Sequence, residues 1–176
     1  YQVNHRQDAI LIAKENISIN HGKKILTIYW REITRLDTRY TDFKFGMTVI
    51  NSNREILLES TDHKPIIIHD RYVEMEEMII QIRRFALPHL YHNTVKKLND
   101  STPISFNKHL LAELQGLKFK QQCTPWHSIN KPEIERGRLI LREDKQDEKI
   151  FGNFKLEKIK NLDLLLLLCD NPPKKY

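Results

Sequence analysis

Two hexapeptides, Ile28-Tyr29-Trp30-Arg31-Glu32-Ile33 and Thr124-Pro125-Trp126-His127-Ser128-Ile129, decide the fold, because they place both tryptophans of the chain in one Trp-x-x-Ile pattern. A turn and a stretch of alternating polar and apolar residues precede each hexapeptide, and a glycine with another apolar stretch follows it. Each half then ends in an apolar stretch of helical spacing. Landmarks that recur in one order indicate an internal repeat, which outranks single residues in predicting a fold. The sequence therefore predicts two related halves.

The first half has the composition and spacing of short strands. We expect strands at residues 9–13, 17–19, 25–30, 33–40, 43–50, 55–60 and 66–68, which are rich in β-branched and aromatic residues. Turn-forming residues separate these runs, and Asn51-Ser52-Asn53 predicts a hairpin turn between two of them. Strands spaced by roughly ten residues are typical of an antiparallel sandwich or barrel.

The hydrophobic period changes after residue 70. Apolar residues recur at steps of three and four, which predicts an amphipathic helix: Tyr72, Met75, Ile79, Ile82 and Ala86. Asp70 suits the N-cap of this helix. We expect Pro88 to interrupt it and a second helical stretch to follow at residues 88–98. Residues 99–103, Asn-Asp-Ser-Thr-Pro, predict a linker.

The second half repeats this plan in shorter form. We expect strands at residues 110–114, 117–120, 128–133, 138–142 and 149–151. A closing helix is predicted at 154–169, with Asn153 as its cap. Because this half has fewer expected strands, its sheet is expected to be incomplete or to borrow a strand from the first half.

The chain resembles pleckstrin-homology-like (PH-like) domains, in particular uncharacterised bacterial families of this kind, as a tandem repeat. The matching residues are Gly116-Leu117, Trp126, Ile129, Gly137-Arg138-Leu139 and the leucine-rich run 162–168. The resemblance implies a mainly β protein with capping α-helices (α+β), built from two small antiparallel barrels or sandwiches, each closed by a C-terminal helix. The expected domains are residues 1–87, a connecting helix and linker at 88–103, and 104–176 with a polar tail. Such folds bind lipid headgroups, bind peptides or serve as scaffolds, so the fold does not choose a function.

Composition and charge exclude some classes of protein. The 176 residues carry a net charge of +6 with a pI near 9.3, which fits a soluble surface with extra lysines or a partner that is anionic. The longest apolar run, 164–169, is far shorter than the roughly 20 residues that span a bilayer. Two cysteines do not make a disulfide framework, so we expect a reducing compartment and a cytoplasmic protein.

Two groups of basic residues are candidates for binding phosphate or anionic lipid. They are Lys23, Lys24 and Arg31 in the first half, and Lys118, Lys120, Lys155 and Lys158 in the second. The resemblance implies such a role for the first group, because basic residues of the first strand pair bind headgroup phosphates in lipid-binding PH domains. The fuller basic arrangement of those domains is missing here, and solvated surface lysines explain the pattern equally well.

The remaining candidate residues indicate structure more than chemistry. Trp30 and Trp126, with Ile33 and Ile129, are expected to be structural residues of the repeat. The chain has five glycines and no Gly-rich phosphate loop or nucleophile elbow. Scattered histidines do not supply the three or four ligands of a zinc site. We therefore expect no enzyme, no metal and no cofactor.

These observations favour a non-catalytic interaction module, a scaffold or adaptor that binds a protein partner. Sheet edges of small open barrels accept peptide strands. The stretch 88–98 carries apolar residues that pack onto the second half, between the halves, or against a partner. Two alternatives remain: peripheral binding to anionic membrane lipids through the basic groups, and nucleic-acid binding.

Overall fold

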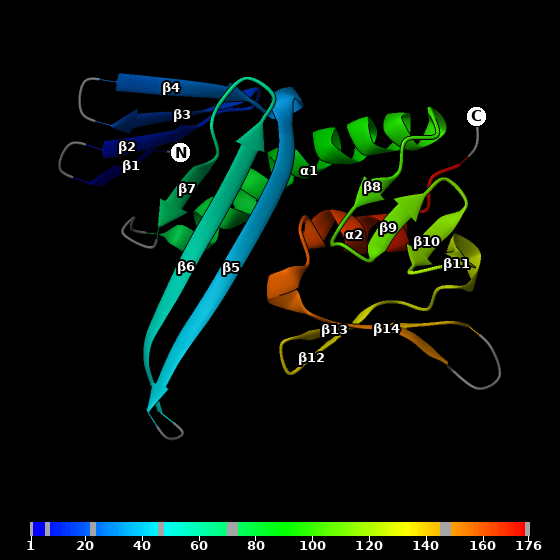
Figure 1. Cartoon of the computed structure of the whole chain (residues 1–176). Coiled ribbons are helices and arrows are strands. Elements are labelled where there is room, and N and C mark those ends of the chain that lie inside the picture. Colours follow the sequence, from blue (N-terminus) through cyan, green and yellow to red (C-terminus); the bar gives the residue numbers. More distant parts are fainter. Residues whose placement is uncertain are drawn as a thin grey trace. The chain divides into compact units, whose positions relative to one another are not determined.

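The computed structural model describes residues 2–5, 8–21, 24–45, 48–69, 74–144 and 149–174. The chain divides into two compact units, Tyr1–Leu90 and Tyr91–Tyr176 (Figure 1). In both, the same order of elements occurs: a four-stranded sheet, one 3-10 turn, a three-stranded sheet and then a helix. The first helix, α1 (Met75–Asn99), runs across the boundary between the units.

The first sheet of unit 1 is an antiparallel meander. Its strands are β1 (Gln2–His5), β2 (Asp8–Ile12), β3 (Asn16–His21) and β4 (Lys24–Tyr29), in the spatial order β1-β2-β3-β4. Side chains alternate between the two faces of a strand, so the register sets which face is buried. Ile12 pairs with Ile17, and Ile17 with Ile28; all three are buried, as is Ile10. This face contributes to the core of unit 1.

The second sheet follows the 3-10 turn η1 (Trp30–Glu32). It contains β5 (Ile33–Phe45), β6 (Thr48–Ser60) and β7 (Ile66–His69), in the order β5-β6-β7. The hairpin turn predicted at residues 51–53 is wrong, because these residues lie inside β6 and pair with residues 43, 42 and 41 of β5. A thirteen-residue partner strand satisfies their backbone groups, which outweighs the local turn preference of Asn and Ser.

Helix α1 is continuous through Pro88, so the predicted interruption there is wrong. A proline inside a helix costs about 3 kcal/mol through its missing N–H and its ring. Burial on both sides offsets this cost: Ala86 is fully buried and Leu90 nearly so. The predicted cap Asp70 and the first apolar position Tyr72 lie outside the described residues.

The described residues of unit 2 form seven strands, two more than the sequence predicts. The first sheet is β8 (Ile104–Ser105), β9 (Leu110–Glu113), β10 (Gly116–Phe119) and β11 (Gln122–Pro125), in the order β11-β10-β9-β8. The 3-10 turn η2 (Trp126–Ser128) leads to β12 (Glu133–Glu135), β13 (Arg138–Arg142) and β14 (Ile150–Lys155), in that order. The chain then passes through η3 (Leu156–Lys158) to α2 (Leu162–Asp170).

Two predicted elements of unit 2 are misplaced. The closing helix begins at Leu162 instead of residue 154, because Phe154 and Lys155 pair with Leu139 and Arg138 in β14. Asn161 has a left-handed backbone, which ends any upstream continuation of the helix. Of the strand predicted at 128–133, Ser128 ends η2, Ile129 forms an isolated bridge with Glu143, and only Glu133 belongs to a strand, the short β12.

The core of unit 2 lies where α2 faces the strands. Leu164, Leu165 and Leu168 of α2 are buried, and so are Leu139 and Leu141 of β13. Three leucines at this spacing form one face of a short helix. No helix in the described part of the chain is long and apolar enough to cross a membrane.

The predicted fold class needs correction. The chain is mostly β with two α-helices, but its strands form four separate small antiparallel sheets, and no ladder among the described residues closes a barrel. Two PH-like barrels, each capped by a helix, are therefore wrong. Closure requires continuous backbone pairing around the barrel, whereas each 3-10 turn interrupts the strand sequence between the two sheets of its unit.

Candidate functional site

Both tryptophans hold the chain in place at the junction between two sheets. The Trp30 indole N–H donates to the Ala13 carbonyl at 2.9 Å, and its backbone N–H donates to the Glu15 carbonyl at 3.1 Å. The Trp30 side chain is fully buried and stacks on Phe85 with ring centroids 6.1 Å apart. A hidden indole with a satisfied N–H stabilises the fold and offers no surface to a ligand.

Trp126 makes the corresponding contacts in unit 2. Its indole N–H lies 3.1 Å from the carbonyl oxygens of Glu113 and Leu114, and its backbone N–H donates to the Gln115 carbonyl. In each unit the isoleucine three residues on, Ile33 or Ile129, donates its N–H to the tryptophan carbonyl. The Trp-x-x-Ile spacing is thus the signature of one closed 3-10 turn.

The first basic group is not assembled into a phosphate site. Lys23 lies outside the described residues. Lys24 begins β4 and Arg31 follows its end, so roughly 20 Å of strand separates them. The Arg31 guanidinium lies over the Tyr29 ring, 5.1 Å from its centroid. One phosphate cannot contact both of these side chains.

The second basic group is partly neutralised. The Lys118 ammonium lies 3.4 Å from a Glu113 carboxylate oxygen, and that of Lys158 lies 3.8 Å from Glu157. The Lys120 ammonium lies over the Phe119 ring, 5.3 Å from its centroid. Lys155 is exposed at the end of β14. The group is a mixed-charge surface more than a concentrated positive patch.

A cluster of buried and half-buried charges lies on β5 and β6. The Arg35 guanidinium donates to Asp37 at 2.8 Å and to Glu59 at 2.7 Å. Burial lowers the pKa of Arg35, but the hydrogen bonds and charges of Asp37 and Glu59 outweigh it and raise the pKa above its ordinary value. All three side chains are engaged with one another, so the cluster stabilises the sheet.

Neither cysteine is an activated nucleophile. Burial, followed by the charge of Glu113, raises the pKa of Cys123, and Lys118 opposes this only in part. Burial and the charge of Asp170 raise the pKa of Cys169 to about 12. Both thiols are free and protonated at neutral pH. Within the described residues, no group of three His, Cys, Asp or Glu side chains is placed to hold a metal ion.

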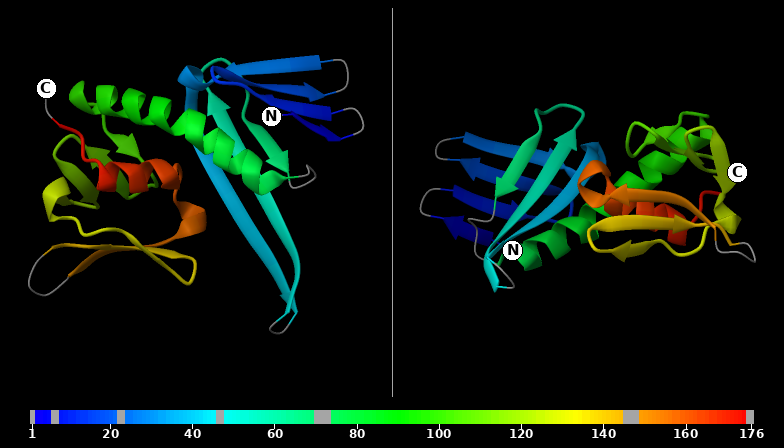
Figure 2. Two further views of the ribbon diagram at one scale, coloured as in Figure 1. Left: turned by 180° about the vertical axis from the view of Figure 1, so that it is seen from behind. Right: turned by 60° about the horizontal axis from the view of Figure 1, so that its bottom comes forward.

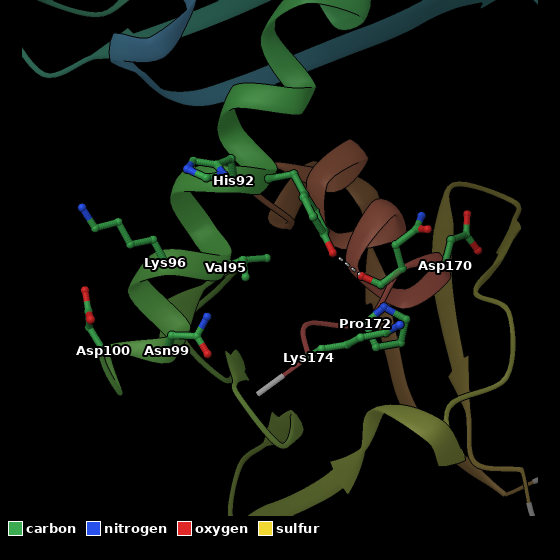
Figure 3. Close-up of a pocket in the computed structure, with 10 residues that line it drawn as sticks. His92, Val95, Lys96, Asn99, Asp100, Asp170, Pro172 and Lys174 are labelled. Atoms are coloured by element: carbon green, nitrogen blue, oxygen red, sulfur yellow. Dashed lines mark hydrogen bonds between the residues drawn. The ribbon is translucent and has the colours of Figure 1, made fainter. Parts of the chain in front are cut away.

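A cavity of about 800 Å³ lies within unit 2, between α1 and the segment that follows α2 (Figure 3). On α1 its lining includes Tyr91, Val95 and Asn99, a stripe with a spacing of four residues. Asn171 and Pro172 line it from the other side. The sequence predicted a helical stretch at residues 88–98, but it did not predict that residues within 170–174 line a cavity beside it.

A long unpaired backbone edge lies on β6, in the hairpin of β5 and β6. In β6, twelve of the thirteen residues pair with β5, but β7 pairs only with Glu55–Leu58. Residues 48–54 therefore have no partner strand on their second side among the residues that the structure describes. Both views in Figure 2 show the hairpin extending beyond β7. Because a turn was expected at residues 51–53, the sequence did not predict a continuous strand edge here.

Comparison with known proteins gives a family and no activity. No curated protein and no solved structure matches the chain. The sequence model of a family of unknown function, DUF6585, matches residues 3–174. Since this match covers nearly all of the 176 residues, the chain belongs to the family DUF6585, whose function is unknown.

Proposed function

We propose that this protein is a non-catalytic interaction module that binds an extended segment of a protein partner by strand addition to β6. The observation that carries the proposal is the edge of residues 48–54, which pairs on one side only. Unpaired N–H and C=O groups along a strand edge are a template for another strand. The sequence of residues 48–53, Thr-Val-Ile-Asn-Ser-Asn, contains no charge, proline or glycine to discourage such pairing.

The expected affinity is modest. Seven edge residues present three or four N–H and C=O pairs toward a new strand, because alternate residues face each side. At about 1 kcal/mol net for each hydrogen bond, the backbone alone contributes only several kcal/mol. Association itself costs about 4 kcal/mol or more. A transient adaptor is therefore expected, with the partner's side chains supplying the additional affinity.

The placement of charge favours a protein partner over the two alternatives. Lys24 and Arg31 are far apart, and Lys118 and Lys158 have carboxylate neighbours, so attraction to an anionic membrane or nucleic acid has little concentrated charge to depend on. We include a cytoplasmic location in the proposal because both cysteines are free.

A tandem repeat also stays a prediction. It is supported by the shared element order and by the matched bonds from the Trp30 and Trp126 backbone N–H groups to Glu15 and Gln115. Because a 3-10 turn of this kind forms locally, the matched bonds alone do not decide between common descent and shared geometry.

Two neighbouring proline substitutions test the strand edge. Residues 52 and 53 pair regularly with residues 42 and 41, and neighbouring residues in a strand point their N–H groups to opposite sides. One of Ser52→Pro and Asn53→Pro therefore removes an N–H from the open edge, and the other removes an N–H bonded to β5. Proline is tolerated on the open side of an edge strand and not on the paired side. Urea unfolding identifies which variant is which, since only the paired-side change lowers stability.

The binding assay is affinity capture at low and high salt with nuclease and with membranes retained. We expect a discrete protein partner with the native chain at both salt concentrations, and its loss from the open-edge variant although that variant melts like the native chain. Equal recovery with the open-edge variant would refute strand addition at this edge. Recovery only with anionic lipid at low salt would refute the protein-binding function and support membrane attachment.

A further inference from the structure

The segment after α2 lies between two cavities of unit 2. The first is the cavity shown in Figure 3, with the stripe Tyr91, Val95 and Asn99 on α1. The second, of about 410 Å³, is lined by Leu114, Gln115, Trp126, His127, Pro172 and Pro173. Pro172 lines both cavities. The two cavities lie on either side of Pro172, and we refer to them together as the groove.

Few hydrogen bonds hold residues 171–174 in place. The Tyr91 hydroxyl donates to the Asn171 carbonyl at 2.8 Å, as the dashed line in Figure 3 shows. Among the described residues, no hydrogen bond or ion pair reaches residues 172–174. Pro172 and Lys174 are exposed, and Pro173 is half-buried. Asn171 also donates its backbone N–H and its Nδ2 to the Leu167 carbonyl, at 2.9 and 3.5 Å, so the part of the segment that is readily displaced is residues 172–174.

The groove has the chemistry that recognises extended proline segments. Two successive prolines have no N–H to donate and favour the polyproline II conformation, which leaves their carbonyls free. Grooves that bind such segments are lined by aromatic side chains. Here Tyr91 supplies a ring together with a hydroxyl donor that already bonds a backbone carbonyl. Trp126 is only 6% exposed, in contrast to the fully buried Trp30, and lines the other part of the groove.

The charges beside the groove favour a basic residue next to the prolines. Apart from Lys174, the Lys, Arg, Asp and Glu side chains lining the first cavity are Lys96, Asp100 and Asp170. One positive and two negative charges leave a net −1. The chain's own segment, Asn-Pro-Pro-Lys, places a lysine directly after its prolines.

We propose that this groove is a binding site for an extended, proline-containing basic peptide of a protein partner, and that residues 171–174 occupy it in cis. The site lies in unit 2 and does not depend on the β6 edge of unit 1. Displacement of the chain's own segment accompanies binding, so the segment acts as a competitor of the partner peptide.

Fluorescence anisotropy with a labelled peptide, Asp-Asn-Pro-Pro-Lys-Lys, tests this site. The full-length chain with Pro172→Ser and Pro173→Ser is expected to bind the probe at least tenfold more tightly than the native chain, because its own segment competes less. Adding Tyr91→Phe to that variant keeps the ring, removes the donor and is expected to weaken binding about fivefold, the worth of one hydrogen bond. Tyr29→Phe, in unit 1, is the matched control and is expected to leave binding unchanged.

A second measurement does not depend on variants. The two indole N–H resonances of the native chain distinguish the groove from the rest of the molecule, since Trp126 lines it and Trp30 is buried in unit 1. Saturating probe is expected to shift the Trp126 resonance and leave that of Trp30 in place. An unmoved Trp126 resonance, or equal binding of a probe with serine in place of both prolines, would overturn the proposal. These outcomes leave the strand-edge experiment unaffected.

Discussion

Among the glycines of unit 2, Gly116 is the one at which an added methyl group should lower the free energy of unfolding most. It pairs with Pro125 where β10 meets β11, and a Cβ built there would lie 2.1 Å from the Thr124 carbonyl oxygen and 2.9 Å from Pro125 Cα. Both atoms belong to the backbone, so no side-chain rotation relieves the overlap. Ordinary contact distances are about 3.5 Å, so the two strands must separate by more than about 1 Å.

The expected loss for Gly116→Ala is about 2–3 kcal/mol. Overpacking of a dense site costs up to about 3 kcal/mol, and the lower entropy of the unfolded alanine chain returns somewhat under 1 kcal/mol. For a unit of under one hundred residues, this difference corresponds to a lower melting temperature by roughly 10–20 °C. The assay is urea unfolding followed by tryptophan fluorescence, with the midpoint converted to free energy at constant slope.

Two other glycines of unit 2 serve as matched controls. A Cβ at Gly137 meets no atom within 4 Å, but its φ of +73° strains any L residue, so Gly137→Ala should cost about 1–2 kcal/mol. At Gly152 the overlap is with the Phe154 ring, a side chain that can move. Gly116→Ala should therefore be the most damaging of the three. If it leaves the midpoint within experimental error of the native chain, the close approach of β10 and β11 is wrong.

Three further predictions concern buried polar groups. Trp126→Phe removes the indole donor to two carbonyls and should lower the free energy of unfolding by about 2 kcal/mol, measured by urea unfolding. At pH 8 a thiol with a pKa of about 12, such as that of Cys169, is ionised in only about one molecule in ten thousand. Iodoacetamide should therefore label the exposed Cys123 first. The labelling rate of Cys169, followed by mass spectrometry, should rise about tenfold for each unit of pH increase. Asp37→Ala leaves the Arg35 guanidinium, 15% exposed, without its nearer carboxylate and should cost about 3 kcal/mol in urea unfolding, whereas joint replacement of the pair by Leu and Met should cost much less.

Hydrophobic periodicity predicted the elements that form through local interactions or that bury one face completely. The alternation around Ile17 and the three-to-four spacing of Met75, Ile79 and Ile82 each produce the expected element, because burial selects the same residues that the pattern marks. The Trp-x-x-Ile spacing marked both junctions between sheets, although it encodes a 3-10 turn instead of the end of a strand.

The errors arise where distant residues decide the outcome. Asn51-Ser52-Asn53 is a sound turn sequence, yet a long partner strand keeps it extended. Leu156 and Ile159 continue the helical spacing of α2 upstream, but pairing of Phe154 with Leu139 places the start of the predicted helix in a sheet, and Leu156 lies in η3. Barrel closure depends on which strands pair across a whole unit, and no local pattern carries that information.

The same dependence on long-range pairing explains why the sequence did not predict the candidate strand edge. An open edge is defined by the strand that is missing beside it, and β7 is too short to cover β6. Several other edges of the described sheets are protected by length or charge: β8 has two residues, β12 has three, two of which are Glu133 and Glu135, and the longer outer edge strand β5 carries five charged residues. The uncharged stretch 48–53 lacks both protections and exposes the chain to unwanted association. Such an edge is compatible with a well-behaved protein when a partner strand covers it, which is why the edge outranks the scattered lysines as the surface to test first.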